Sequence, residues 1–275
     1  MTHTTATHKP TLMQKLLGSH YKWWYIIKYS YSASNSNFNA FIFSTAIRTI
    51  EFLAVIYIWK INNSPADLIT YLAIGRVFDR LSFSEIHTIL QMYIGRGGLS
   101  RFLLLPTSFF GYMIADNIGY NLIRSVINSI IILGFALVIF NGSLIFSVNV
   151  FYLICYFMIT YLIKSFLGFI TGSIAFLVND NANSRAIVES VQVASGLLSG
   201  EIIPLFVLFS GFSNPVFWTP FAFLFHHPMQ VYLGKYDFNQ TLMVFAGGIA
   251  WCVVLYFLAK WVFKMGLKRN EAVGL

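Results

Sequence analysis

The stretch LMVFAGGIAWCVVLYFLAKWV, which runs from Leu242 to Val262, contains a single charged residue, Lys260. A helix needs about 20 apolar residues to cross the hydrocarbon core of a bilayer. This stretch reaches that length with almost no charge, so it predicts a membrane-spanning helix. The rest of the sequence is interpreted outward from this segment.

The composition of the whole chain also indicates an integral membrane protein. Of its 275 residues, 57% are hydrophobic and only 10% are charged, whereas a soluble domain carries about 25% charged residues. The net charge is +8, which in a membrane protein reflects the excess of Lys and Arg in cytoplasmic loops. We therefore expect an all-α membrane protein with the lipid bilayer around it and no nucleic-acid partner.

Further apolar runs, separated by short polar turns, bring the expected number of spans to six. The predicted spans are residues 37–59, 68–94, 118–140, 150–177, 187–209 and 242–262. Six spans return the chain to the side on which it began. Lys22 and Lys28 precede the first span, and Lys264, Lys268 and Arg269 follow the last. These basic residues place both termini in the cytoplasm.

The N-terminal region predicts an amphipathic helix over residues 11–29. On a helical wheel Leu16, Trp23 and Trp24 share one side, and Lys15 and Lys22 lie opposite. Trp beside Lys is typical of a helix that lies in the membrane interface. A solvated helix packed on a neighbour is the alternative. We expect three parts: a cytoplasmic N-terminus (1–36), a six-span domain (37–263) and a basic cytoplasmic tail (264–275).

Residues 212–236 are apolar but interrupted by Pro215, Pro220 and Pro228. The segment is too short for two full spans, and irregular backbone at membrane depth needs protein or water to satisfy it. We predict a re-entrant helical hairpin on the outer side. A surface loop with loose apolar residues is the alternative.

Polar residues inside the predicted spans are the candidates for function, because a charge near the bilayer centre costs roughly 3 kcal/mol or more unless it meets a partner or water. In the first span Arg48 and Glu51 are three residues apart and can pair. In the second span one polar stripe contains Arg76, Asp79, Arg80, Ser84, His87 and Gln91. The stripe either lines a substrate-facing seam or forms a structural polar network between helices. Glu85 falls on the opposite, apolar face without an explanation.

No catalytic motif is present. The sequence has no G-x-x-x-x-G-K-[ST] loop, H-E-x-x-H, G-x-S-x-G or C-x-x-C. His226 and His227 are adjacent, and adjacent residues on a helix point apart. We therefore expect no catalytic residue and no metal site in this chain.

Two stretches resemble a known family. IGRGGLSRFLLLP, from Ile94 to Pro106, resembles the I-x-x-G-x-L-x-x-x-L-L-x-P segment of type-2 ATP-binding-cassette exporter permeases. SGEIIPL, residues 199–205, together with Pro220-Phe221 and Pro228, is similar to the G-x-x-x-P-L and re-entrant P-F…P elements of that family. The resemblance covers about residues 38–270.

The resemblance implies which residues do what. A coupling helix at about residues 98–110 would contact the ATPase, through Gly97, Gly98, Arg101, Leu103, Leu104, Pro106 and Phe109. Substrate would pass between two permeases along the first, second and fifth spans, past Arg48, Glu51, Arg76, Asp79, Arg80 and Glu201. Together, Arg76, Arg80 and Lys164 favour an anionic or amphipathic cargo.

The implied function is the permease subunit of an ATP-driven ABC exporter in the cytoplasmic (inner) membrane. The resemblance implies a separate cytoplasmic ABC ATPase, which holds ATP and Mg²⁺, and a second permease that is identical or homologous. This chain would bind no cofactor and would not be an enzyme on its own. An ATP-independent channel or carrier and a membrane-embedded lipid-acting enzyme remain the alternatives.

Overall fold

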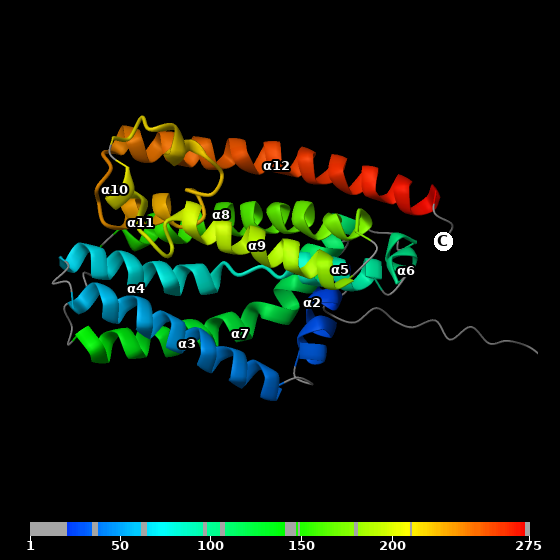
Figure 1. Cartoon of the computed structure of the whole chain (residues 1–275), viewed down its shortest axis with the longest axis horizontal. Helices are drawn as coiled ribbons and strands as arrows, with labels where there is room; N and C mark the ends of the chain where they lie inside the picture. The colour runs from blue at the N-terminus through cyan, green and yellow to red at the C-terminus, as the bar shows by residue number, and fades with distance from the viewer. Residues whose placement is uncertain are drawn as a thin grey trace, which may run out of the picture.

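Figure 1 shows the computed structural model of the chain, which describes residues 21–34, 38–61, 65–95, 98–104, 108–140, 147, 149–178, 181–209 and 211–272. Within these ranges every regular element is a helix. The long elements are α2 (Tyr21–Ser34), α3 (Phe38–Ile61), α4 (Ala66–Leu81), α5 (Ile86–Gly95), α7 (Phe109–Phe140), α8 (Val150–Gly172), α9 (Asn181–Ser199) and α12 (Phe238–Ala272). The short ones are α6 (Leu99–Leu103), η3 (Ser173–Phe176), α10 (Leu205–Leu208), η4 (Pro215–Trp218) and α11 (His226–Tyr232).

The long helices are arranged as a bundle. Helix α3, the α4–α5 pair, α7, α8, α9 and α12 lie along the long axis, and successive members run in opposite directions (Figure 1). One end of the bundle holds α10 and α11, and the other holds α6 and the C-terminus. Segments far apart in the sequence thus lie at the same end of the bundle.

Four helices in the described part of the chain are long and apolar enough to cross a membrane. They comprise Phe41–Ile61, Phe109–Ile139, Val150–Phe176 and Phe238–Arg269, and they correspond to the first, third, fourth and sixth predicted spans. The all-helical class is therefore confirmed, and four of the six predicted spans are recovered. The helices α7 and α12 are longer than the predicted spans.

The second predicted span is two helices rather than one. Helix α4 ends at Leu81 and α5 begins at Ile86, so the sequence-based continuous helix over 68–94 is wrong at its centre. At the end of α4 the Ser82 amide donates to the Phe78 carbonyl at 3.0 Å, and its hydroxyl donates to the same carbonyl at 2.9 Å. The Ser82 hydroxyl therefore competes with the backbone amide for the last carbonyl groups of α4. Neither α4 nor α5 alone is long enough to span a bilayer.

The fifth predicted span begins and ends earlier than expected. Helix α9 stops at Ser199, and Gly200 follows with φ 85°. Glu201 N–H donates to the Gly196 carbonyl at 3.2 Å and Gly200 N–H to the Leu197 carbonyl at 3.3 Å, which is a Schellman termination that favours glycine at this position. Glu201 consequently lies in the turn after the helix.

The N-terminal helix α2 crosses the bundle axis and packs on α7. The close approach occurs at Gly119, which lies against the backbone of Ile27. The Ser30 hydroxyl donates a hydrogen bond to the Asp116 carboxylate. Trp24 and Tyr25 point away and are exposed. The predicted helix over 11–29 is thus seen from residue 21 onward, and residues 11–20 lie outside the described residues.

The middle of the proline-rich segment between α9 and α12, residues 222–232, is buried at one end of the bundle. All seven residues of α11 are buried. The Thr160 hydroxyl donates to the Phe223 carbonyl at 3.1 Å, and the Phe225 ring lies so close to Gly75 of α4 that a Cβ there would collide with it. The segment is therefore not a loose surface loop.

Candidate functional site

The break between α4 and α5 is occupied by a lysine from another helix. Lys164, at the middle of α8, places its Nζ 2.6 Å from Oδ1 of Asp79 and 2.9 Å from Oγ of Ser82. The same Nζ donates to the Asp79 carbonyl at 3.1 Å. A cation at this position satisfies carbonyl and carboxylate groups together and opposes the negative end of the α4 dipole. Lys164 thus stabilises the place where the helix is interrupted.

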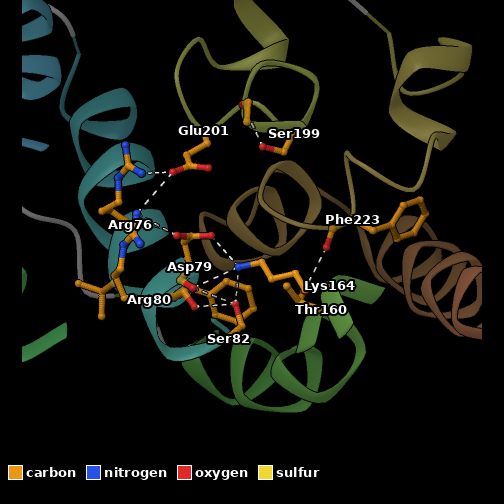
Figure 2. Close-up of polar contacts among 12 residues, drawn as sticks. Arg76, Asp79, Arg80, Ser82, Thr160, Lys164, Ser199, Glu201 and Phe223 are labelled. Atoms are coloured by element: carbon orange, nitrogen blue, oxygen red, sulfur yellow. Dashed lines mark hydrogen bonds and ion pairs between the residues drawn. The ribbon is translucent and has the colours of Figure 1, made fainter. Parts of the chain in front are cut away.

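A second ion pair joins α4 to the turn after α9. The Arg76 guanidinium pairs with the Glu201 carboxylate, and Arg80 lies 4.0 Å from the same carboxylate and 3.5 Å from Asp79 (Figure 2). The side chains of this cluster are between 11% and 20% exposed. Three cations thus meet two carboxylates in one largely buried network.

Arg76 and Asp79 are three residues apart on α4, but no ion pair within 4.0 Å joins these two described residues. Asp79 pairs instead with Lys164 of α8, and Arg76 pairs with Glu201 in the turn after α9. Sequence analysis left Lys164 and Glu201 without partners because both lie far from α4 in the sequence. Arg76, Asp79 and Arg80 therefore belong to an ion network between segments of the chain, and their place on a translocation path stays a prediction.

Arg48 and Glu51 do not form an ion pair within 4.0 Å in the described part of the chain. Arg48 instead lies over the ring of Phe83, 4.7 Å from the ring centroid, and Glu51 is exposed. Phe83 belongs to the break between α4 and α5, so α3 contacts this break directly. A cation over an aromatic face contributes about 0.5–2 kcal/mol.

Glu85 is explained by the same break. Its backbone amide donates to Oδ1 of Asn117 on α7 at 2.9 Å, and its carboxylate interacts electrostatically with Arg48 and Arg124. Because residues 82–85 are not helical, the wheel that placed Glu85 on the apolar face does not apply to it.

The half of the stripe on α5 has a different environment, a pocket of about 430 Å³ between α5 and α9. His87 and Gln91 from α5 line it together with Arg185, Glu189 and Gln192 from α9. Hydrogen bonds from His87 and Gln91 join α5 to α9. His87 Nε2 lies 2.6 Å from Nε2 of Gln192, and Gln91 donates to Oγ of Ser184 at 2.7 Å.

The expected ATPase contact at residues 98–110 is a shorter helix than predicted. Helix α6 spans Leu99–Leu103, and α7 begins at Phe109. Leu103 is 42% exposed and Leu104 is 85% exposed, so both offer apolar surface. Phe109 is stacked on Phe263 at 4.9 Å and packs against the buried core.

The remaining residues proposed for this contact are less informative. Gly98 has φ −83°, a conformation open to any residue, so the turn there does not require glycine. Gly97 and Pro106 lie outside the described residues, as does the side chain of Arg101.

The histidine pair is held by aromatic residues. His227 Nε2 is 2.6 Å from the Phe217 carbonyl and therefore donates, while Nδ1 is 3.0 Å from the Tyr236 hydroxyl. The His226 ring stacks on Phe217 with 4.7 Å between centroids. Among the described residues, no three His, Cys, Asp or Glu side chains are grouped so that they could hold a metal ion.

A family model described as ABC-2 family transporter protein matches residues 63–274, which is most of the chain and contains the ion network, the pocket and α6. The chain belongs to the ABC-2 transporter family. No curated protein and no solved structure matches it. Helices α2 and α3 precede the matched region. As an ABC-2 permease, the chain is a multi-pass membrane transport protein and not an enzyme that acts alone.

Proposed function

We propose that this ABC-2 permease is the membrane subunit of an ATP-driven exporter, energised by a separate cytoplasmic ABC ATPase that holds ATP and Mg²⁺. Family membership is the observation that carries the proposal, since ABC transport couples a membrane subunit to an ATP-binding-cassette ATPase. The sequence contains no P-loop of its own. The exposed apolar side chains of Leu103 and Leu104, at the end of the bundle that holds the C-terminus, supply a docking surface.

The proposed topology has six crossings in the inner membrane, with both termini in the cytoplasm. The α4–α5 pair forms the second crossing as a discontinuous helix, and α9 forms the fifth. Discontinuous helices occur in transporters where irregular backbone is satisfied by neighbouring protein, and Lys164 supplies that satisfaction here. Residues 212–236 form the outer re-entrant hairpin, opposite α6 and the basic tail.

The proposed path lies on the side of the molecule formed by α5 and α9. Helix α9 keeps Arg185, Glu189 and Gln192 exposed in the isolated chain, an arrangement that is unfavourable against lipid and favourable against water or another subunit. A second permease, identical or homologous, would cover this side, and cargo would pass between the two.

The test begins with gentle purification of the tagged full chain from its native membranes. We expect a P-loop ATPase to co-purify and its activity to depend on this chain. The variant Leu104→Asp should reduce that association at unchanged membrane yield. Phe238→Asp is the matched control, because Phe238 is 74% exposed at the opposite end of the bundle.

Two results would contradict the proposal. A preparation that contains no ATPase even after crosslinking would favour a channel or carrier. Equal ATPase loss in the Leu104 and Phe238 variants would remove α6 from the docking surface.

A further inference from the structure

The pocket between α5 and α9 contains two full charges of opposite sign. Arg185 and Glu189 are four residues apart on α9, so their side chains emerge on the same face. Both line the pocket, yet no ion pair within 4.0 Å joins them or links either to another residue of the described chain. The site therefore presents one available cation and one available anion a helical turn apart.

The depth of these charges makes their isolation costly in a membrane. With a rise of 1.5 Å per residue, Glu189 lies about 12 Å from the start of α9 and Gln192 about 16 Å. On the proposed topology these residues reach below the headgroup layer, where an unpaired charge is expensive without water or a ligand. A ligand bearing both signs of charge would satisfy Arg185 and Glu189 together.

The rest of the pocket suits an uncharged linkage between two such charges. Thr88, Gln91 and Gln192 supply hydroxyl and amide groups to the lining. Outward along α9 from Gln192, the side chains of Val193 and Leu197 are 61% and 43% exposed. A polar pocket that continues into exposed apolar surface matches a molecule with a polar head and an apolar tail.

We infer that this pocket binds the zwitterionic headgroup of an amphipathic lipid that enters sideways from the inner leaflet. The anionic group of the headgroup faces Arg185, the cationic group at the end of the headgroup folds back toward Glu189, and the apolar chains lie along Val193 and Leu197. The inference rests on the proposed function, because it assigns the pocket to the cargo of the exporter.

The structure argues against a purely anionic cargo at this position. The three cations that suggested one, Arg76, Arg80 and Lys164, are already engaged with Asp79 and Glu201. In the pocket itself, Arg185 is offset by Glu189, which would repel an anionic headgroup.

The experiment uses the full chain alone in nanodiscs, so it does not depend on the ATPase. Two photoreactive lipids with identical acyl chains are compared, one with a phosphoethanolamine headgroup and one with a phosphoglycerol headgroup, and crosslinks are mapped by mass spectrometry. We expect crosslinks in α5 and α9 and a preference for the phosphoethanolamine lipid. Glu189→Gln should lower this labelling about tenfold, the effect of one lost charge-assisted hydrogen bond.

The charge reversal Glu189→Lys provides a gain of signal that misfolding cannot produce, because it should turn the preference toward the phosphoglycerol lipid. Lys264→Gln, an exposed charge on α12 away from the pocket, should change neither labelling pattern. Soluble glycerophosphoethanolamine tests the source of the headgroup. Full competition by this compound would assign the site to a water-soluble zwitterion and overturn the lipid assignment.

Labelling spread evenly over lipid-facing helices, or unchanged by both Glu189 variants, would overturn the inference. If the ATPase still co-purifies in that case, the exporter function stands and only the cargo site fails. Selective labelling with no ATPase found would instead support the pocket in a lipid carrier and remove the ATP-driven function.

Discussion

Helices α4 and α5 share one polar stripe in the sequence but differ in how their polar residues are satisfied. On α4, Arg76 and Asp79 are buried and engaged by residues from elsewhere in the chain. On α5, His87 and Gln91 line a pocket and form hydrogen bonds with neutral groups of α9. The first half of the stripe is thus joined into an ion network, and the second half lines a pocket.

The difference arises from the partners and not from the stripe itself. Lys164 and Glu201 supply α4 with opposite charges. Helix α9 presents to α5 a polar face whose two charges stand outside every ion pair of the described chain. A buried, paired charge mainly specifies how helices fit together, and removing one partner is costly. Pocket residues whose charges form no ion pair in the described chain add little to stability, so they are the better candidates for contact with the proposed cargo.

Breaking the α4 network should have the largest effect on stability. Asp79→Ala leaves Lys164 buried without a carboxylate, and we expect a loss of about 3–5 kcal/mol in the free energy of unfolding. The measurement is the melting temperature of the purified protein in detergent, together with membrane yield. Asp67→Ala on the same helix is the matched control, since its ion pair with Lys235 is exposed and contributes at most about 1 kcal/mol.

The double variant Asp79→Asn with Lys164→Met tests the reason for that loss. Replacing both charges removes the uncompensated cation, so much of the stability should return. A double variant as unstable as Asp79→Ala would mean that packing at this position, and not charge pairing, is responsible.

A smaller loss is expected at the other end of the network. Glu201→Gln leaves Arg76 without its carboxylate, but Glu201 is 20% exposed, so water partly replaces it. We expect a loss of about 1.5–3 kcal/mol, measured by the same thermal unfolding. Glu189→Gln, which breaks no ion pair of the described chain, should leave the free energy of unfolding within about 0.5 kcal/mol of the parent. If Glu201→Gln and Glu189→Gln lowered the free energy of unfolding equally, the proposed difference between the ion network and the pocket would be wrong.

Apolar run length was sufficient to predict the helical class, the membrane location and four of the spans. It could not predict the break after Leu81, because Ser82 and Ser84 are compatible with a continuous helix. One signal was present, the position of Glu85 on the apolar face of the wheel. A charged residue out of phase with its helix indicates that the phase changes, and here it changes at residues 82–85.

The ion network itself was beyond sequence reasoning. Three of its members were selected from the stripe and Glu201 from the family resemblance, but their pairing depends on how α8 and the turn after α9 approach α4. The end of α9 was easier to predict from the sequence, since glycine after an apolar helix is a common stop signal. Ser199-Gly200 therefore contained the information that places Glu201 outside the helix.

A hydrogen bond connects α4 to Gly200, the glycine that follows the end of α9. The Tyr71 hydroxyl donates to the Gly200 carbonyl at 3.2 Å, and Tyr71 is fully buried. Tyr71→Phe removes the bond and keeps the ring, so we expect a loss of about 1 kcal/mol by thermal unfolding. Tyr57→Phe, at a residue 64% exposed on α3, is the control and should have no measurable effect.

The smallest stability change should accompany a clear functional change in the pocket. Gln192→Ala removes an exposed side chain, so the free energy of unfolding should stay within about 0.5 kcal/mol of the parent. It also deprives His87 of its 2.6 Å partner across the pocket, so cargo-stimulated ATP hydrolysis by the assembled transporter should fall. Ser190→Ala, exposed on the same helix but not part of the pocket lining, is the matched control. If Gln192→Ala lowered stability as much as Tyr71→Phe, α5 and α9 would form a structural network like that of α4. Reduced ATP hydrolysis at unchanged stability would instead show that the α4 half of the stripe is structural and that the α5 half acts in transport.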